Sequence, residues 1–263
     1  MDKSKTVILF LIDGMRPDGL LKANTPVMDH MIATGAHTLD ARTIMPSVTL
    51  PCILSLFLGV TPERHGNTTN VYTPPARPIP GLFDVIQTAG GKTASFYNWE
   101  ELRDVSRPGS LNASFCLKNC YASDGVGDIE LANLTTSWLR KNPVNFAFVY
   151  LGYTDAAGHD FGWMSEKYLQ GITIADRCIG QIMSSLPENS IVIITSDHGG
   201  HAQSHGTDSD DDMQTPMIIN GPGIPMGGII SQTVNITDLA PTVTGIFGIE
   251  SPVEWIGKGI HFS

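Results

Sequence analysis

The stretch Ile191-Val-Ile-Ile-Thr-Ser-Asp-His-Gly-Gly200 decides the fold class of this chain. Its first five residues are apolar or β-branched without alternation, which is the pattern of a strand covered on both faces. A carboxylate, an imidazole and two glycines follow at once. Open α/β sheets bind their ligands at the carboxyl ends of parallel strands. We therefore predict that Asp197 and His198 are functional residues at such a strand end.

The rest of the chain alternates between strand and helix patterns. Further strands are expected at 6–12, 36–43, 92–98, about 114–121, 145–151 and 215–220. Helices are expected at 25–34, 52–58, 81–89, 128–141, 165–186 and 238–247, with Asp128 as the cap of the fourth. This alternation predicts one α/β domain over residues 1–263, a three-layer αβα sandwich with a mostly parallel central sheet.

Composition narrows the function classes. The 263 residues are 41% hydrophobic and 16% charged, as in globular proteins, and the net charge of −10 with no Lys/Arg-rich run argues against a nucleic acid polymer as partner. The apolar run 6–12 is too short to span a membrane and no cleavage site follows it, so we expect no membrane association. The four cysteines form no zinc-finger pattern, which favours reduced thiols in the cytoplasm. The oligomeric state stays open.

Carboxylates follow three of the expected buried strands, and imidazoles lie close behind. A single aspartate in such a place is usually a turn or cap residue, but three strands ending alike, with glycine nearby, favour a binding site. Three Asp and three His would give each of two zinc-like ions three N/O ligands and open positions. Two metal ions about 3.5–4 Å apart are the usual clamp for displacement at phosphorus. These residues are Asp13, Asp155, His159, Asp197, His198 and His205.

Thr49 is the candidate nucleophile. It stands before the apolar helix pattern of 52–58, so its other interpretation is a helix N-cap. The free N–H groups and the macrodipole at a helix N-terminus favour an anion there. A threonine hydroxyl needs a metal ion or a base to become an effective nucleophile.

Taken together, the motifs resemble the alkaline phosphatase superfamily, and within it the nucleotide pyrophosphatase/phosphodiesterase branch. They are residues 12–16 (Ile-Asp-Gly-Met-Arg), 45–51 (Met-Pro-Ser-Val-Thr-Leu-Pro), 62–66 with Asn70, 154–159, 196–199 and 205–206, and the resemblance covers the chain from residue 6 to about 247. It implies an alkaline-phosphatase-like fold and a two-metal-ion hydrolase of phosphodiester or pyrophosphate bonds. The substrate would be a small phosphorylated molecule, cleaved through a phospho-threonine intermediate.

The resemblance also implies the role of each residue. Asp155, His159 and His205 would hold one divalent ion; Asp13, Asp197 and His198 would hold the other, with Thr49 bridging toward the phosphoryl group. The ions would be zinc, with manganese as the alternative. Asn70 would donate to a phosphoryl oxygen, with Asn67 as the competing residue and the Leu50 N–H as a second donor.

Other readings of the same site stay open at this point. A phosphonoacetate-type or phosphomonoester hydrolase is the enzymatic alternative, with Lys118 as a contact for a substrate carboxylate; an inactive zinc-binding protein is the non-enzyme alternative. No arginine follows Thr49 as in sulfatases. Only six residues separate His198 from His205, where diesterase relatives carry a long insertion, so a substrate cap would come from about 66–80 and 98–125. We expect His201 to be exposed or to lie behind the ligands, and the acidic run 208–212 to be a solvated loop.

Overall fold

The computed structural model describes residues 1–260 of the chain, so the last three residues of the predicted domain lie outside the described part. The strands are β1 (Val7–Ile12), β2 (Ala36–Arg42), β3 (Thr93–Tyr97), β4 (Ala113–Cys116), β5 (Phe146–Leu151), β6 (Ile191–Thr195), β7 (Gln214–Asn220) and β8 (Gly228–Ile229). The α-helices are α1 (Pro17–Lys22), α2 (Pro26–Thr34), α3 (Thr49–Leu58), α4 (Pro62–His65), α5 (Leu82–Thr88), α6 (Val126–Leu139), α7 (Tyr153–Phe161), α8 (Glu166–Met183), α9 (Asp210–Met213) and α10 (Leu239–Ile246). Short 3-10 helices span Glu100–Val105, Ser123–Gly125 and Ile236–Asp238.

The strands form one eight-stranded sheet in the order β4-β3-β5-β1-β6-β7-β2-β8. β1 lies inside the sheet and pairs in parallel with β5 and β6, which are buried along their whole length like β1 itself. Only β7 is reversed among the described strands, since it pairs antiparallel with both β6 and β2. The expected mostly parallel sheet is thus confirmed, and its three most apolar strands lie side by side.

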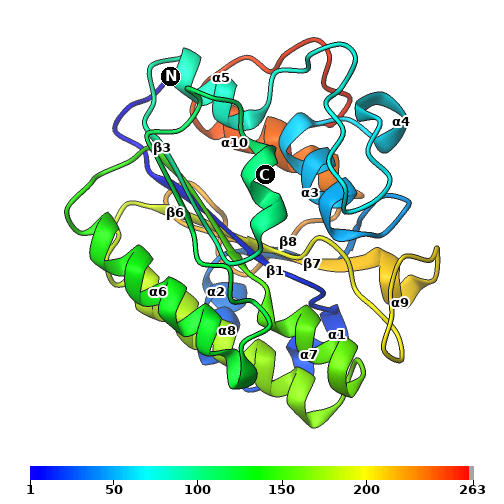
Figure 1. Ribbon diagram of the computed structural model, residues 1–263. Helices are drawn as coiled ribbons and strands as arrows, with labels where there is room; N and C mark the ends of the chain where they lie inside the picture. Colours follow the sequence, from blue (N-terminus) through cyan, green and yellow to red (C-terminus); the bar gives the residue numbers. More distant parts are fainter. Residues whose placement is uncertain (261–263) are drawn as a thin grey trace.

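Helices cover both faces of the sheet, which gives the predicted three layers (Figure 1). On one face α3, α5 and α10 pack over the odd-numbered residues of β1, among them Leu9. On the other face α2, α6 and α8 cover the even-numbered residues, among them Phe10. Because successive strand residues point to opposite faces, a strand buried on both faces has no polar position, and this explains the unbroken apolar runs.

Two local features near the site differ from the expectations. The helices expected from the sequence include none directly after the strand 145–151, but α7 begins at Tyr153, directly after Gly152, and contains Asp155. Asp128 does not cap its own helix, since α6 begins at Val126 with Gly125 as its N-cap. Instead the buried carboxylate of Asp128 accepts hydrogen bonds from the N–H groups of Gly152 and Tyr153, so it caps α7, the neighbouring helix.

Two further observations concern the cysteines and the helices. All four cysteines are free thiols in the structure. Within residues 1–260, none of the helices combines the length and the apolar character that crossing a bilayer requires.

Candidate metal centre and active site

The first ligand cluster joins the ends of β1 and β6. Asp13 follows β1, and Asp197 with His198 follows β6, the neighbouring strand. His198 Nε2 lies 3.3 Å from Asp13 Oδ1 and 3.4 Å from Asp197 Oδ2. All three side chains are buried. One ligand atom from each lies within 4.8 Å of those of the other two, a spacing that could hold a metal ion.

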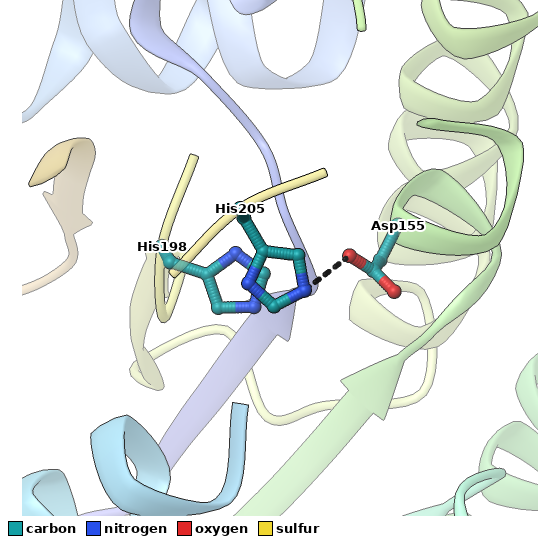
Figure 2. A group of neighbouring side chains, drawn as sticks. All are labelled: Asp155, His198 and His205. Atoms are coloured by element: carbon teal, nitrogen blue, oxygen red, sulfur yellow. Dashed lines mark ion pairs between the residues drawn. The ribbon is translucent and has the colours of Figure 1, made fainter. Parts of the chain in front are cut away.

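The second cluster lies beside the first and shares His198 with it. Asp155, His198 and His205 also bring their ligand atoms within 4.8 Å of one another. Figure 2 shows the imidazoles of His198 and His205 lying over each other, with ring centroids 3.8 Å apart, and the Asp155 carboxylate beside them. His205 Nε2 is 3.7 Å from Asp155 Oδ1. His159, one helical turn after Asp155 on α7, places its Nε2 3.5 Å from Asp155 Oδ2.

The hydrogen bonding of these carboxylates shows what kind of group they would accept. Asp13 Oδ1, Asp155 Oδ1 and Asp197 Oδ2 are buried oxygens without a hydrogen-bond partner in the described part of the chain. A buried carboxylate oxygen without a partner is costly, and a cation supplies what the protein does not. The donor set of carboxylates and imidazoles, with no thiolate, suits a divalent ion at a catalytic centre.

The protonation behaviour of the site leads to the same conclusion. Burial, and then the charge of Asp197, raise the pKa of Asp13 well above its usual value. Burial and the charge of Asp155 raise the pKa of Asp197 to about 7. The pKa of His205 falls to about 3 because of burial and the neighbouring His198. The unneutralised site thus disfavours charge of either sign, and a dipositive ion would restore the ionised carboxylates while binding neutral imidazoles.

Thr49 lies beside this cluster and lines the same cavity as Asp13 and Asp155. It is the first residue of α3, because Val48 is extended and the helix proceeds without interruption to Gly59. The Thr49 hydroxyl lies 3.1 Å from His198 Nε2. No side-chain capping hydrogen bond is made at the start of α3, so the N-cap interpretation of Thr49 is wrong. The hydroxyl at the positive end of the helix is available for chemistry.

The two asparagine candidates differ in their position relative to the cavity. Asn70 lines the cavity and accepts a hydrogen bond from the Leu50 N–H at 3.0 Å. That N–H is therefore already occupied and is not the free second donor that we expected. Asn67 is buried, and among residues 1–260 its side chain bonds only to His65, at the end of α4, and to Thr73. Its position supports a structural role.

Comparison with known proteins identifies the family. The family model described as type I phosphodiesterase / nucleotide pyrophosphatase matches residues 7–216. The chain belongs to this family. Within it, a bis(5'-adenosyl)-triphosphatase (enpp4) of Xenopus laevis is 26% identical over 215 residues, which cover 73% of this chain and 46% of the relative. An ectonucleotide pyrophosphatase/phosphodiesterase family member 3 of Rattus norvegicus is 28% identical, covering 73% of this chain and 24% of the relative.

This family member spans about half the length of the first relative and about a quarter of the second. Solved structures confirm the alkaline-phosphatase-like fold. A murine ectonucleotide pyrophosphatase / phosphodiesterase 5 in complex with AMP superimposes with a TM-score of 0.75 at 18% identity, covering 94% of this chain and 96% of that one. A 2-O GAG sulfatase superimposes with a TM-score of 0.76 at 16% identity, covering 97% of this chain and 73% of that one.

Two aromatic residues of this phosphodiesterase-family site escaped the sequence analysis. Tyr150 is buried on β5 and donates its hydroxyl to Asp13 Oδ2. Trp163 donates from its ring to the carbonyl oxygen of Gly14 at 2.9 Å. A Cβ on Gly200 would lie 2.1 Å from the Trp163 ring, so this backbone must be glycine to pass so close. The tyrosine could have been found from the sequence, because a tyrosine inside an apolar strand has a buried hydroxyl that needs a hydrogen-bond partner.

The cavity beside these ligands is small, about 60 Å³, and its lining joins distant parts of the chain. It is lined by Asp13, Thr49, Asn70, Trp99, Cys120, Tyr121, Tyr150, Gly152, Asp155, His159 and His205. Both segments in which a cap was expected contribute to this lining, Asn70 from 66–80 and Trp99 with Tyr121 from 98–125. Lys118 is not among the lining residues and pairs with Glu100 instead.

The acidic run 208–212 matches the expected solvated loop only in part, because Asp208, Asp210 and Asp211 are exposed but Asp212 is not. Asp212 is fully buried, and its carboxylate lies 2.7 Å from His201 Nδ1. Asp211 forms an ion pair with Arg16, and Asp210 forms one with Arg42. The partners are 11 to 195 positions away, so the sequence alone could not reveal them. His201, expected to be exposed or to lie behind the ligands, is half-exposed and held by Asp212.

Proposed function

We propose that this chain hydrolyses phosphodiester or pyrophosphate bonds with the help of two divalent metal ions and with Thr49 as the nucleophile. The observation that carries the proposal is the Thr49 hydroxyl, 3.1 Å from His198, beside three buried carboxylates that each present an oxygen without a partner. The family of the chain supports the same reaction class. The relatives' own substrates belong to longer proteins and do not transfer directly to this chain.

The residues present fit two ions of zinc, or of manganese as the alternative. Asp155, His159 and His205 would hold one, and Asp13, Asp197 and His198 the other, with Thr49 between them and the phosphoryl group. Bound ions of this kind restore the ionised carboxylates, lower the pKa of a hydroxyl beside them and draw charge from phosphoryl oxygens. His205 donates Nδ1–H to the Ser47 carbonyl at 2.8 Å, which leaves Nε2 as the ligand atom.

The chain's own residues supply the nucleophile and the orientation. The Thr49 hydroxyl gives up its proton to water, and Oγ1 forms a bond to phosphorus while the bond from phosphorus to the leaving oxygen breaks; the leaving oxygen takes a proton from water. A second displacement by water then cleaves the bond between Thr49 and phosphorus. Because the Leu50 N–H holds the carbonyl end of the Asn70 amide, its NH₂ end is the part that can donate to a phosphoryl oxygen.

The charge of the cavity favours diesters over monoesters. Neither lysine nor arginine is among the residues that line it. A monoester dianion or a phosphonate with a carboxylate carries one more negative charge than a diester and would need such a cation. A space of about 60 Å³ holds the reacting phosphoryl group but not a whole nucleotide, so the leaving group extends past Trp99 and Tyr121 toward solvent. We therefore expect a broad tolerance for leaving groups.

Metal analysis and a substrate panel test the proposal. Protein purified without chelator should contain close to two zinc or manganese ions per chain. After chelation and reloading with zinc, it should hydrolyse bis(p-nitrophenyl) phosphate faster than p-nitrophenyl phosphate and faster than phosphonoacetate. Bound metal without turnover of any of these substrates would favour the inactive metal-binding alternative. Preference for the monoester or the phosphonate would overturn the charge argument.

A further inference from the structure

The short connection between the two candidate ligands His198 and His205 needs a support of its own. Six residues separate them, and the segment turns back on itself at a pair of hydrogen bonds between His201 and Ser204, each 2.9 Å. The stacked imidazoles must nevertheless keep a fixed separation, with ring centroids 3.8 Å apart. A segment this short contains no helix or strand of its own to supply that rigidity.

The acidic run 208–212 supplies this rigidity from outside the segment. The Gly199 N–H donates to the Asp212 carbonyl at 2.8 Å, and the Gly200 N–H donates to the Asp211 carbonyl at 2.7 Å. A Cβ on Gly199 would lie 2.1 Å from the Asp211 carbonyl oxygen, so the two backbones cross in contact. The start of the connection, just after His198, is thereby fixed to α9.

One buried carboxylate then holds both sides of His205. Asp212 is 0% exposed and its carboxylate lies 2.7 Å from His201 Nδ1, four residues before His205. The same carboxylate accepts from the Thr207 N–H at 2.8 Å and the Thr207 hydroxyl at 2.7 Å, two residues after it. The other two aspartates of α9 direct their carboxylates to arginines, Asp210 to Arg42 and Asp211 to Arg16, whose own guanidinium donates to the Gly200 carbonyl.

Hydrogen bonds link this segment to the residues just before Thr49, the candidate nucleophile. Ser47 donates its hydroxyl to the Thr207 carbonyl at 2.7 Å, and its own carbonyl lies 2.8 Å from His205 Nδ1. Ser47 stands two residues before Thr49. Asp212 thus orders Thr207, and Thr207 and His205 both meet the loop that carries the nucleophile.

We infer that Asp212 is a positioning residue for His205. It holds the imidazole so that Nε2 faces Asp155, and the metal ion between them depends on it. This inference rests on the proposed function and deepens it. It assigns to α9 the support of His205 that a longer insertion could give in a larger protein. Outer partners that orient metal ligands typically change metal affinity or activity by about 10- to 100-fold when removed.

The test compares Asp212→Ala and Asp212→Asn with Asp210→Asn, which makes the same charge change in the same helix at a side chain that is 72% exposed. Zinc affinity of the two sites is measured by competition with a chelating dye, and fold by circular dichroism. We expect Asp212→Ala to weaken one of the two zinc ions by about 10- to 100-fold while the other is retained. Asp212→Asn, which keeps an acceptor for Thr207, should lie between Asp212→Ala and the wild type, and Asp210→Asn should match the wild type.

The outcomes separate the two proposals. If wild-type protein binds two zinc ions and Asp212→Ala binds both with unchanged affinity, the positioning role is wrong while the proposed function stands. Equal weakening of both sites, or loss of the folded spectrum in Asp212→Asn as well as in Asp212→Ala, would mean that Asp212 is only structural. Wild-type protein that binds no zinc or manganese would overturn both proposals.

Discussion

Replacing Asp128 by asparagine tests the electrostatics behind the site. Asp128 is 0% exposed, and one of its oxygens accepts from the Asn98 side chain and from the Gly152 N–H at 2.6 and 3.1 Å. Its other oxygen has no partner among residues 1–260. The residue caps α7, whose third residue is Asp155. The substitution removes the charge and keeps the shape, so its effect reports the ionisation of this carboxyl group.

The magnitude follows from the pKa. Burial raises the pKa of Asp128 from 3.8 to about 7. At about 1.36 kcal/mol for each pKa unit, ionising the carboxyl in the folded state costs about 4 kcal/mol more than in the unfolded chain. Because the folded pKa is the higher one, the unfolded state releases its proton first, and the stability of the wild type falls as pH rises from about 4 to about 7. The Asp128→Asn variant cannot ionise at this position, so its stability does not fall with pH for this reason.

The free energy of unfolding in urea, measured at pH 5 and pH 8 on chelated protein, gives the comparison. We expect the stability difference, Asp128→Asn minus wild type, to increase by about 2–4 kcal/mol between these pH values. Asp124→Asn serves as the control, since Asp124 is 65% exposed and its positive φ of 54° suits asparagine. A difference that stays constant with pH, or that grows equally in the control, would refute the argument for a raised pKa at Asp128.

The remaining predictions concern the site itself. Thr49→Ala should keep metal content and fold but lower kcat by about 10³-fold or more, whereas Thr49→Ser should retain measurable turnover; full activity in the alanine variant would exclude this nucleophile. Asp197→Ala should lose one of the two metal ions in elemental analysis along with most activity, and an unchanged metal content would exclude it as a ligand. Asn70→Ala should lower kcat by about 100-fold at unchanged thermal stability. Asn67→Ala should instead cost about 2 kcal/mol of stability, because the buried Asn67 amide bonds the backbones of His65 and Thr73, and the alanine leaves the buried His65 carbonyl without this donor. A loss of kcat in Asn67→Ala with a loss of stability in Asn70→Ala would mean that the two asparagines have the opposite roles.

The parts of the fold that the sequence predicted best are those with the strongest local patterns. The strands around Leu9, Phe148 and Ile193 are apolar on both faces. The parallel order of these strands then brings Asp13, Asp155 and Asp197 together, because their carboxyl ends share one edge of the sheet. Ligand residues at strand ends are therefore predictable as a group.

What the sequence did not predict depends on hydrogen bonds that leave no pattern in the sequence. Asp128 caps α7 rather than its own helix, because its carboxylate lies within hydrogen-bond distance of the N–H groups of Gly152 and Tyr153. Asp212 is buried because His201 and Thr207 satisfy its carboxylate, although a run of aspartates normally indicates a solvated loop. Neither arrangement has a local periodicity that a reader of the sequence could detect.

The most direct test of the central claim is the mass of the peptide that contains Thr49 after acid quenching during turnover of bis(p-nitrophenyl) phosphate. Attack by Thr49 with loss of one p-nitrophenolate predicts a p-nitrophenyl phosphoryl group on this residue. The modification should be absent from Thr49→Ala and from chelated enzyme. Substrate turnover at the full wild-type rate, with an unmodified Thr49 peptide in a burst-phase quench and with activity retained in Thr49→Ala, would contradict the account.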